Sequence, residues 1–216
     1  MRRYENRSRL LAIGLAALAG FVDALGFLKL GGMFVSFMSG NSTRMAAGVA
    51  TPIHGSLFAG ALIAAFVVGV MTGTVGGQAA GRWRQPAVLA IVLCLLVAGC
   101  LAETLVGRST PATLLVAGAM GAANAIFQRD GEVSVGVTYM TGTLVKFAQH
   151  LTAALTGGPR LGWMPYFLLW LGLMAGATAG ASAYRLIGFQ ALWMAVGFGL
   201  CLLLQALWLG PLPARE

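Results

Sequence analysis

Long apolar segments alternate with short polar breaks along the whole chain. Six of these segments are candidates for helices that cross a membrane: residues 10–30, 56–81, 87–106, 112–128, 163–185 and 191–209. A helix needs about 20 apolar residues to cross the hydrocarbon core of a bilayer. The pattern therefore predicts an all-α integral membrane protein that forms a single membrane domain over residues 1–216.

Two shorter segments, residues 32–50 and 135–155, follow a different pattern. Each has an extended apolar run, then a polar turn at residues 39–43 or 141–143, then a short helix. The first short helix, over residues 41–50, would be only about 15 Å long, or half of a ~30 Å hydrocarbon core. Non-helical backbone at that depth survives only inside protein or beside a wet cavity. We therefore expect two part-way helices, broken or re-entrant, with residues 33–38 and 133–140 inside the bundle.

The second half of the chain repeats the order of the first half. Asp23 aligns with Asn124 at an offset of 101 residues, and Met38 aligns with Met140 at an offset of 102. At an offset of 103, three glycines match three others: Gly69, Gly73 and Gly77 with Gly172, Gly176 and Gly180. Three signals at nearly one offset predict a tandem duplication, with repeat one over residues 8–107 and repeat two over residues 111–210.

The distribution of basic residues separates two possible topologies. Two full crossings by the polar-turn segments would give eight spans, and part-way entry would give six spans with an inverted repeat. With the N-terminus inside, and Arg44 and Lys146 set aside, eight spans place seven basic residues inside and five outside. Six spans place nine inside and leave only Lys29, Arg108 and Arg185 outside. The positive-inside rule favours six spans with both termini in the cytoplasm.

Composition supports the membrane assignment and narrows the functional classes. The chain is 58% hydrophobic and 9% charged, with a mean hydropathy of +0.83, whereas soluble domains carry about 25% charged residues. The net charge of +8 comes from basic residues placed singly between apolar segments and clustered at the N-terminus. That layout indicates cytoplasmic anchoring to the lipid bilayer and no binding of nucleic acid.

No catalytic chemistry is visible in the sequence. It contains no Walker motif, no GxSxG, no HExxH and no CxxC pair, so we expect no enzyme activity. The three cysteines all fall inside apolar segments, which argues against a disulfide framework and against zinc. We expect neither a cofactor nor a metal.

The two polar turns are the candidate binding site. Unpaired N–H groups and a partial positive charge at a helix start favour anionic or carbonyl-bearing ligands. Two such starts facing each other near the midplane would bind a small polar or anionic solute, as in inverted-repeat transporters. The candidate solute-binding residues share this location: Asp23, Met38, Ser39, Gly40, Asn41, Thr43, Asn124, Tyr139, Thr141, Gly142 and Thr143. The alternative is that Ser39, Asn41, Ser42, Thr43, Thr141 and Thr143 only cap the two helices.

Asp23 is a candidate for ion coupling. A carboxylate within a membrane span is costly and marks a functional site by default, and desolvation favours its neutral form, which suits proton coupling. The alternative is that Asp23 accepts hydrogen bonds from Asn41 or Ser39 and only holds the fold. Arg44 and Lys146 could attract an anion, pair with Asp23 or reach an interface. Glu103 is expected to pair with Arg108.

The glycine ladders allow helices to approach backbone to backbone. We expect them to pack on each other or on the short helices, and a homodimer interface is a further possibility.

Three motifs resemble the YoaK-like family of bacterial membrane proteins, a domain of unknown function: Gly20–Asp23, Gly31–Thr43 and Thr138–Leu144. The resemblance covers nearly the whole chain and implies a multi-pass protein of the bacterial inner membrane. It implies no particular substrate. Three hypotheses remain: a small secondary transporter, a channel-like pore with the two turns as its constriction, and a membrane scaffold without flux.

Overall fold

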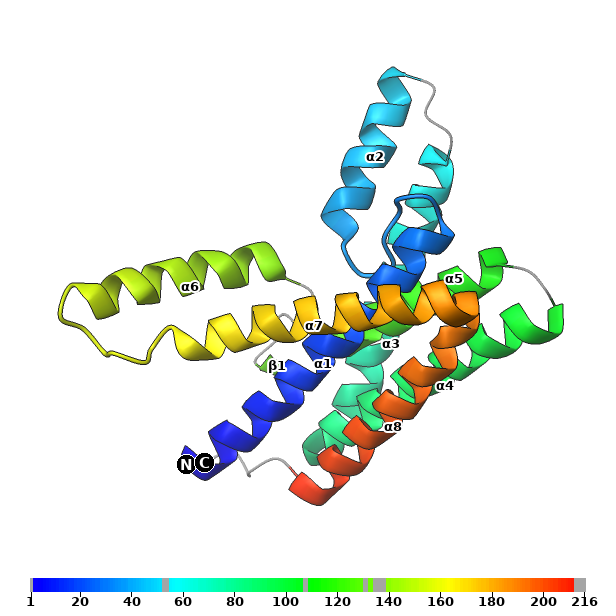
Figure 1. Cartoon of the computed structure of the whole chain (residues 1–216). Helices are drawn as coiled ribbons and strands as arrows, with labels where there is room; N and C mark the ends of the chain where they lie inside the picture. Colours follow the sequence, from blue (N-terminus) through cyan, green and yellow to red (C-terminus); the bar gives the residue numbers. More distant parts are fainter. Residues whose placement is uncertain (1, 52–54, 107–108, 130–131, 134–138, 212–216) are drawn as a thin grey trace.

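The computed structural model describes residues 2–51, 55–106, 109–129, 132–133 and 139–211, and helices make up nearly all of them (Figure 1). The elements in chain order are α1 (Arg2–Lys29), α2 (Met38–Ala50), α3 (Ser56–Ala79), η1 (Gly81–Trp83), α4 (Arg84–Val106), α5 (Ser109–Ala123), β1 (Gln128–Arg129), β2 (Glu132–Val133), α6 (Met140–Leu155), α7 (Met164–Ile187), η2 (Gly188–Ala191) and α8 (Leu192–Leu209). β1 and β2 form a two-residue antiparallel pair. The all-α prediction is confirmed apart from this small hairpin.

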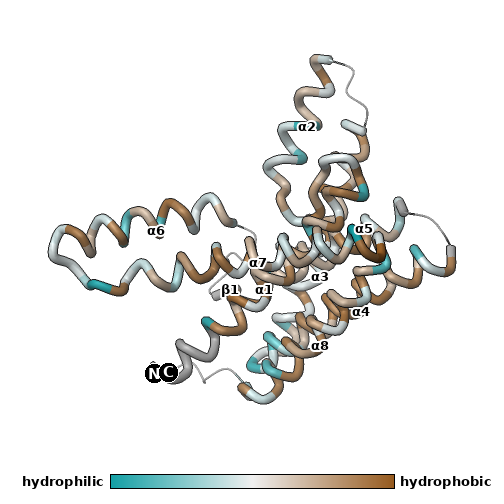
Figure 2. The backbone as a smooth tube through the Cα atoms, in the orientation of Figure 1, coloured by the Kyte–Doolittle hydropathy of each residue, from teal (hydrophilic) through white to brown (hydrophobic). Residues whose placement is uncertain are grey.

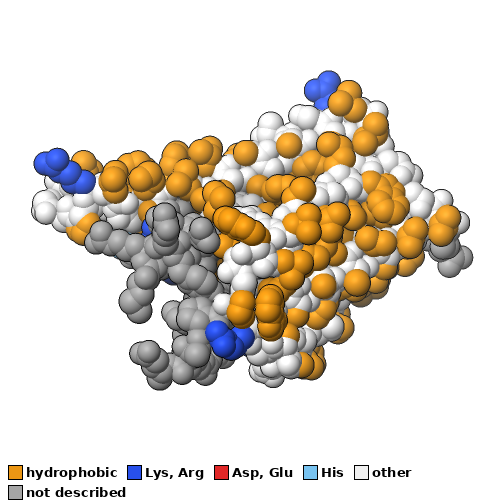
Figure 3. Space-filling model, turned by 90° about the horizontal axis from the view of Figure 1, so that it is seen from below, with side chains coloured by type: hydrophobic (Ala, Val, Ile, Leu, Met, Phe, Trp, Pro, Cys, Tyr) orange, Lys and Arg blue, Asp and Glu red, His pale blue; other side chains and the backbone are white. Residues whose placement is uncertain are grey.

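Four helical stretches of the described chain are long and apolar enough to cross a membrane. They are residues 9–29, 56–79, 81–105 and 164–209, and the last stretch contains both α7 and α8. α5 is apolar but shorter. Figure 2 shows that apolar residues dominate these helices, and in Figure 3 apolar side chains cover much of the visible surface, with Lys and Arg in a few separate places. The chain is therefore a membrane protein.

Successive long helices reverse direction. α3 and α4 run antiparallel, because Gly76 and Gly77 of α3 lie near Ile91 and Val88 of α4. In Figure 1, α1, α4 and α7 run towards the upper right, and α3, α5 and α8 return. α2 and α6 both start at the bundle and point away from it, α2 packed on α3 and α6 packed on α7.

The closest helix contacts join parallel helices from the two halves of the chain. A methyl group at Gly176 on α7 would overlap the backbone carbonyl of Ala17 on α1, and one at Gly69 on α3 would overlap that of Gly118 on α5. The expectation that the ladders pack on each other or on the short helices is therefore wrong. Each glycine ladder packs this closely only on a helix face that is also free of large side chains. α1 and α5 provide such a face at Gly20 and Gly121.

The register of these two contacts differs from the sequence alignment by one turn. Gly69 and Gly73 of α3 contact α5 in the same way as Gly176 and Gly180 of α7 contact α1. These equivalent glycines are 107 residues apart in the chain, whereas the sequence alignment pairs glycines that are 103 residues apart. Both contacts belong to the same continuous core, which includes Leu15 and Leu18 of α1 and Val116 and Met120 of α5.

Gly176→Leu is expected to destabilise the protein by about 3 kcal/mol or more, because overpacking forces backbone apart and costs ~1–3 kcal/mol even in adaptable cores. The measurement is unfolding of the purified protein in mixed micelles. Gly197→Leu is the matched control, since Gly197 on α8 is exposed and no other described residue comes within 4 Å of a Cβ there. Equal losses in the two variants would contradict the backbone contact.

Candidate functional site

Asp23 fixes the loop between α1 and α2. The backbone N–H groups of Val35 and Ser36 donate to its Oδ1 at 2.9 and 2.7 Å, and the Ser36 hydroxyl donates to its Oδ2 at 2.5 Å. Both carboxylate oxygens thus accept hydrogen bonds from the chain itself. The expected donors were Asn41 or Ser39, whereas the donors observed are Val35 and Ser36.

These hydrogen bonds also set the depth of the loop. Asp23 lies six residues before the end of α1 at Lys29, which is about 9 Å along the helix axis. The chain reverses at Gly31 and Gly32, whose φ angles are +62° and +96°, and returns along α1 to the level of Asp23. Positive φ angles of this kind favour glycine.

The prediction that residues 33–38 lie inside the bundle is confirmed for part of the segment. Met33, Val35 and Ser36 are buried, while Phe37 is exposed. In the second segment, residues 134–138 lie outside the described residues.

Asn41 holds the same loop from the α2 side. Its side chain is fully buried, its Nδ2 donates to the Phe34 carbonyl at 2.6 Å, and its Oδ1 accepts from the Phe34 N–H at 3.0 Å. The side-chain carboxamide of Asn41 therefore forms the same pair of hydrogen bonds with the Phe34 backbone that a residue of a neighbouring β-strand would form. Nδ2 also approaches the Met38 sulfur at 3.7 Å.

Gly40 and Arg44 complete the first turn. A Cβ at Gly40 would lie 2.8 Å from the Phe37 ring and 3.1 Å from the Phe34 ring, so the absence of a side chain admits these two rings. Arg44 donates from Nη1 to the Gly32 carbonyl at 2.8 Å and from Nη2 to the Gly31 carbonyl at 3.2 Å. Three side chains on two helices thus hold one loop.

The predicted capping by hydroxyl groups is wrong in both turns. The N-cap residues are Phe37 and Tyr139, and neither makes a side-chain cap hydrogen bond. The helices begin at Met38 and Met140, so the polar residues lie within the first turn. From there, hydroxyls bond back to carbonyl groups four residues earlier: Ser42 to Met38, Thr43 to Ser39 and Thr143 to Tyr139.

The second turn is more open than the first. Tyr139, Thr141 and Gly142 are exposed, and no atom of the described residues lies within 4 Å of a Cβ at Gly142. Thr143 is buried. Asn124, just beyond the end of α5, is buried and donates from Nδ2 to the Met120 carbonyl of its own helix at 2.9 Å.

One ion pair was missed by the sequence analysis. Lys29 Nζ at the end of α1 lies 2.8 Å from Glu103 Oε1 near the end of α4, and 5.4 Å from the centre of the Phe189 ring. The partner expected for Glu103 was Arg108, which lies outside the described residues. The two partners are 74 residues apart, so only the fold reveals the pair.

The remaining histidine, cysteine and acidic side chains that the structure describes do not cluster. Across the described ranges, no three His, Cys, Asp or Glu side chains come together in an arrangement that could hold a metal ion. His150 on α6 stacks on Tyr166 of α7, with ring centres 4.9 Å apart. His54 lies outside the described residues.

The apolar helices and the buried polar turn define a polytopic α-helical membrane protein. Residues 11–205 match the family described as "Protein of unknown function (DUF1275)", so the chain belongs to this family. This match confirms the resemblance to the YoaK-like family. The chain is also 34% identical over 193 residues to the UPF0700 transmembrane protein RA0705 of Rhizobium meliloti (strain 1021), covering 89% of this chain and 83% of that protein. No solved structure matches the chain.

Asn41→Ala should lower the free energy of unfolding by about 2 kcal/mol, because it leaves the partly buried N–H and C=O groups of Phe34 without these partners. Ser39→Ala is the control, since Ser39 is exposed on the same turn of α2. Thermal unfolding of both variants in one detergent gives the comparison. If Asn41→Ala is no less stable than Ser39→Ala, the hydrogen bonds to Phe34 do not hold the loop.

Proposed function

We propose that the protein is a small secondary transporter that binds a small anionic solute at the start of α6. The observation that carries this proposal is a difference between the halves. Asp23 supplies a negative charge beside the start of α2, whereas the neutral Asn124 takes the aligned position before α6. At this aligned position, the first half of the chain therefore carries a carboxylate and the second half a neutral carboxamide.

The electrostatics of a helix start explain why this difference matters. The partial positive charge of a helix N-terminus stabilises a nearby anion. Asp23 meets this preference at α2 by accepting from Val35 and Ser36, two residues just before the helix. Binding of a solute anion there would compete with a covalently attached one.

The start of α6 presents the chemistry that an anion requires. Thr141 and Gly142 are exposed in its first turn, and the absence of a side chain at Gly142 permits close approach. Lys146 follows one turn later and is also exposed. Its ammonium group adds an attractive charge on the same helix.

The helix arrangement supports an inverted repeat with six crossings. Along the chain, helices α1, α3, α4, α5, α7 and α8 alternate in direction (Figure 1). The loop after α1 turns back to the level of Asp23 before α2 begins. The Lys29–Glu103 pair offsets one of the three basic charges assigned to the outside. Inverted repeats with interrupted helices near the midplane are a common plan of secondary transporters. We place both termini in the cytoplasm and the protein in the bacterial inner membrane.

In this proposal Asp23 is a fixed internal anion. Coupling to a proton through Asp23 would place the proton on Oδ2, which would then donate to the Ser36 hydroxyl, while Oδ1 could still accept from the Val35 and Ser36 N–H groups. Solute flux that changes with pH in the wild type but not in Asp23→Asn would assign the coupling role to this residue.

A non-transporting membrane scaffold is the second candidate. It is favoured by the first turn, where Asp23, Asn41 and Arg44 all bond to the protein's own backbone. A scaffold predicts that Gly73→Leu impairs function and that substitutions at Thr141 and Gly142 have no effect.

Asn124→Asp is expected to abolish anion binding, because it places a carboxylate where the first half has Asp23. The readout is the shift in thermal unfolding of the purified protein with a panel of small inorganic anions, carboxylates and amino acids. A ligand at 100 times its Kd stabilises by about 2.7 kcal/mol. Uptake of the same anion into proteoliposomes tests transport directly.

Ser39→Ala serves as the control for that experiment and should keep the ligand shift, because it leaves the second turn unchanged. A panel in which no anion shifts the wild type, or an anion that still shifts Asn124→Asp, counts against the proposed site. A shift without uptake favours the scaffold.

A single cysteine distinguishes six crossings from eight. In a background lacking Cys94, Cys100 and Cys201, Thr51→Cys should react with an impermeant maleimide on intact cells, because six crossings place the α2–α3 tip outside. Thr156→Cys at the α6–α7 tip should react only after lysis, as both topologies place it inside. Protection of Thr51→Cys in intact cells would establish eight crossings.

A further inference from the structure

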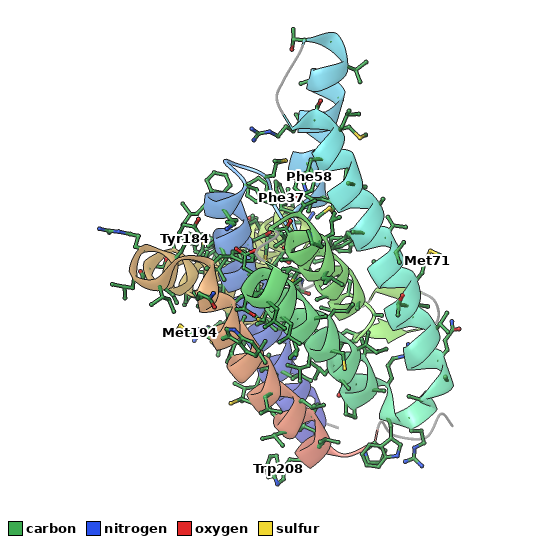
Figure 4. The ribbon with its side chains drawn as sticks, turned by 90° about the vertical axis from the view of Figure 1, so that its right-hand side faces the viewer. Phe37, Phe58, Met71, Tyr184, Met194 and Trp208 are labelled. Atoms are coloured by element: carbon green, nitrogen blue, oxygen red, sulfur yellow. The ribbon has the colours of Figure 1, made fainter. Side chains whose placement is uncertain are left out.

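A groove of about 520 Å³ runs between α3 and α4, on the outer surface of the bundle. Its lining residues are Val68, Met71, Thr72, Val75, Gly76 and Ile91. Val68, Met71 and Val75 are 60–66% exposed, and Met71 points away from the bundle (Figure 4).

The groove lining has one polar side chain, which is already hydrogen-bonded within α3. This side chain, Thr72, donates its hydroxyl to the Val68 carbonyl at 2.8 Å. The groove therefore offers a surface to hydrocarbon and little to a polar solute.

Two arginines lie in the segment that follows this groove along the chain. The segment that joins α3 to α4 reads Arg82-Trp83-Arg84, and Arg82 and Trp83 are exposed. The Arg84 side chain lies against Gly77, with Nε 3.0 Å from where a Cβ would stand, and Gly77 follows the groove residue Gly76.

We propose that this groove binds an anionic phospholipid, with one acyl chain along α3 and α4 and the phosphate at Arg82 and Arg84. The site combines the two parts that such a lipid needs, an apolar channel and a cationic end. Basic pockets between membrane helices on the cytoplasmic side bind anionic head groups, and tryptophan is enriched at the membrane–water interface. A free phosphate ion would leave the apolar groove empty.

The structure offers an internal control groove. A second groove of about 310 Å³ lies among α1, α7 and α8 and includes Phe21, Ala179, Met194 and Phe198. The segment that joins α7 to α8, η2, carries no basic residue, although Arg185 precedes it on α7. This groove therefore lacks the paired arginines of the first.

The test measures lipid retention by native mass spectrometry of the full-length protein in neutral detergent, with added phosphatidylglycerol or phosphatidylcholine. We expect the wild type to retain phosphatidylglycerol preferentially. The double variant Arg82→Gln/Arg84→Gln should lose about 30-fold in affinity, since each basic contact at a membrane surface contributes a factor of about five. Val75→Trp should reduce retention by filling the groove.

Two matched variants and one rescue make the result decisive. Arg185→Gln and Ala179→Trp should retain the lipid, and Arg82→Lys/Arg84→Lys should restore most of the binding. Equal retention of the two lipids by the wild type, or unchanged retention in Arg82→Gln/Arg84→Gln, overturns the proposal. If Arg82→Gln/Arg84→Gln fails to fold, the test relies on Arg82→Lys/Arg84→Lys. A folded Arg82→Lys/Arg84→Lys protein that does not prefer phosphatidylglycerol also overturns the proposal. This assay measures lipid at the α3–α4 groove and does not involve the proposed anion site at α6. The result is therefore independent of the transporter proposal.

Discussion

The absence of water inside a bilayer is the constraint on which this structure depends. Backbone groups in the hydrocarbon region require partners within the protein, and the broken segment between α1 and α2 has no helix to supply them. Asp23 accepts from the N–H groups of Val35 and Ser36, and Asn41 meets both polar groups of Phe34. Arg44 bonds to the carbonyls of the reversal at Gly31 and Gly32. The start and the direction of α2 follow from these bonds.

Packing between helices follows from the same constraint. Lipid tails are as apolar as leucine, so helices gain little by hiding apolar side chains and associate instead through close contact of small residues. The ladders of α3 and α7 meet α5 and α1 at this distance. Each contact joins the first half of the chain to the second, so the two halves are interleaved and share one core.

The sequence predicted the long helices well because apolar length is itself the cause of membrane insertion. The segment 56–81, for example, became α3 over Ser56–Ala79. The details of the polar turns were not predictable in the same way. Hydroxyl residues suit both a helix cap and a first turn, and the outcome depended on where the two helices begin, at Met38 and Met140. The partners of Asp23 and Glu103 depended on a glycine reversal and on contacts across 74 residues.

The described residues of the two polar turns make different side-chain contacts. In the first, Asp23 on α1 and Asn41 on α2 both bond to the loop, so the two helices are tied to each other through it. In the second, Thr143 bonds to Tyr139 at the start of its own helix, and Asn124 bonds to Met120 within α5. Aromatic contacts of Phe147 with Trp163 and Phe167 join α6 to α7 at 5.9 and 5.5 Å between ring centres. Aromatic rings can pack in several geometries, whereas hydrogen bonds to a charged group require a short distance and a fixed direction. In the transporter that we propose, an anion at the start of α6 would approach a helix that ring contacts join to α7, whereas α2 is tied to α1 through Asp23 and Asn41.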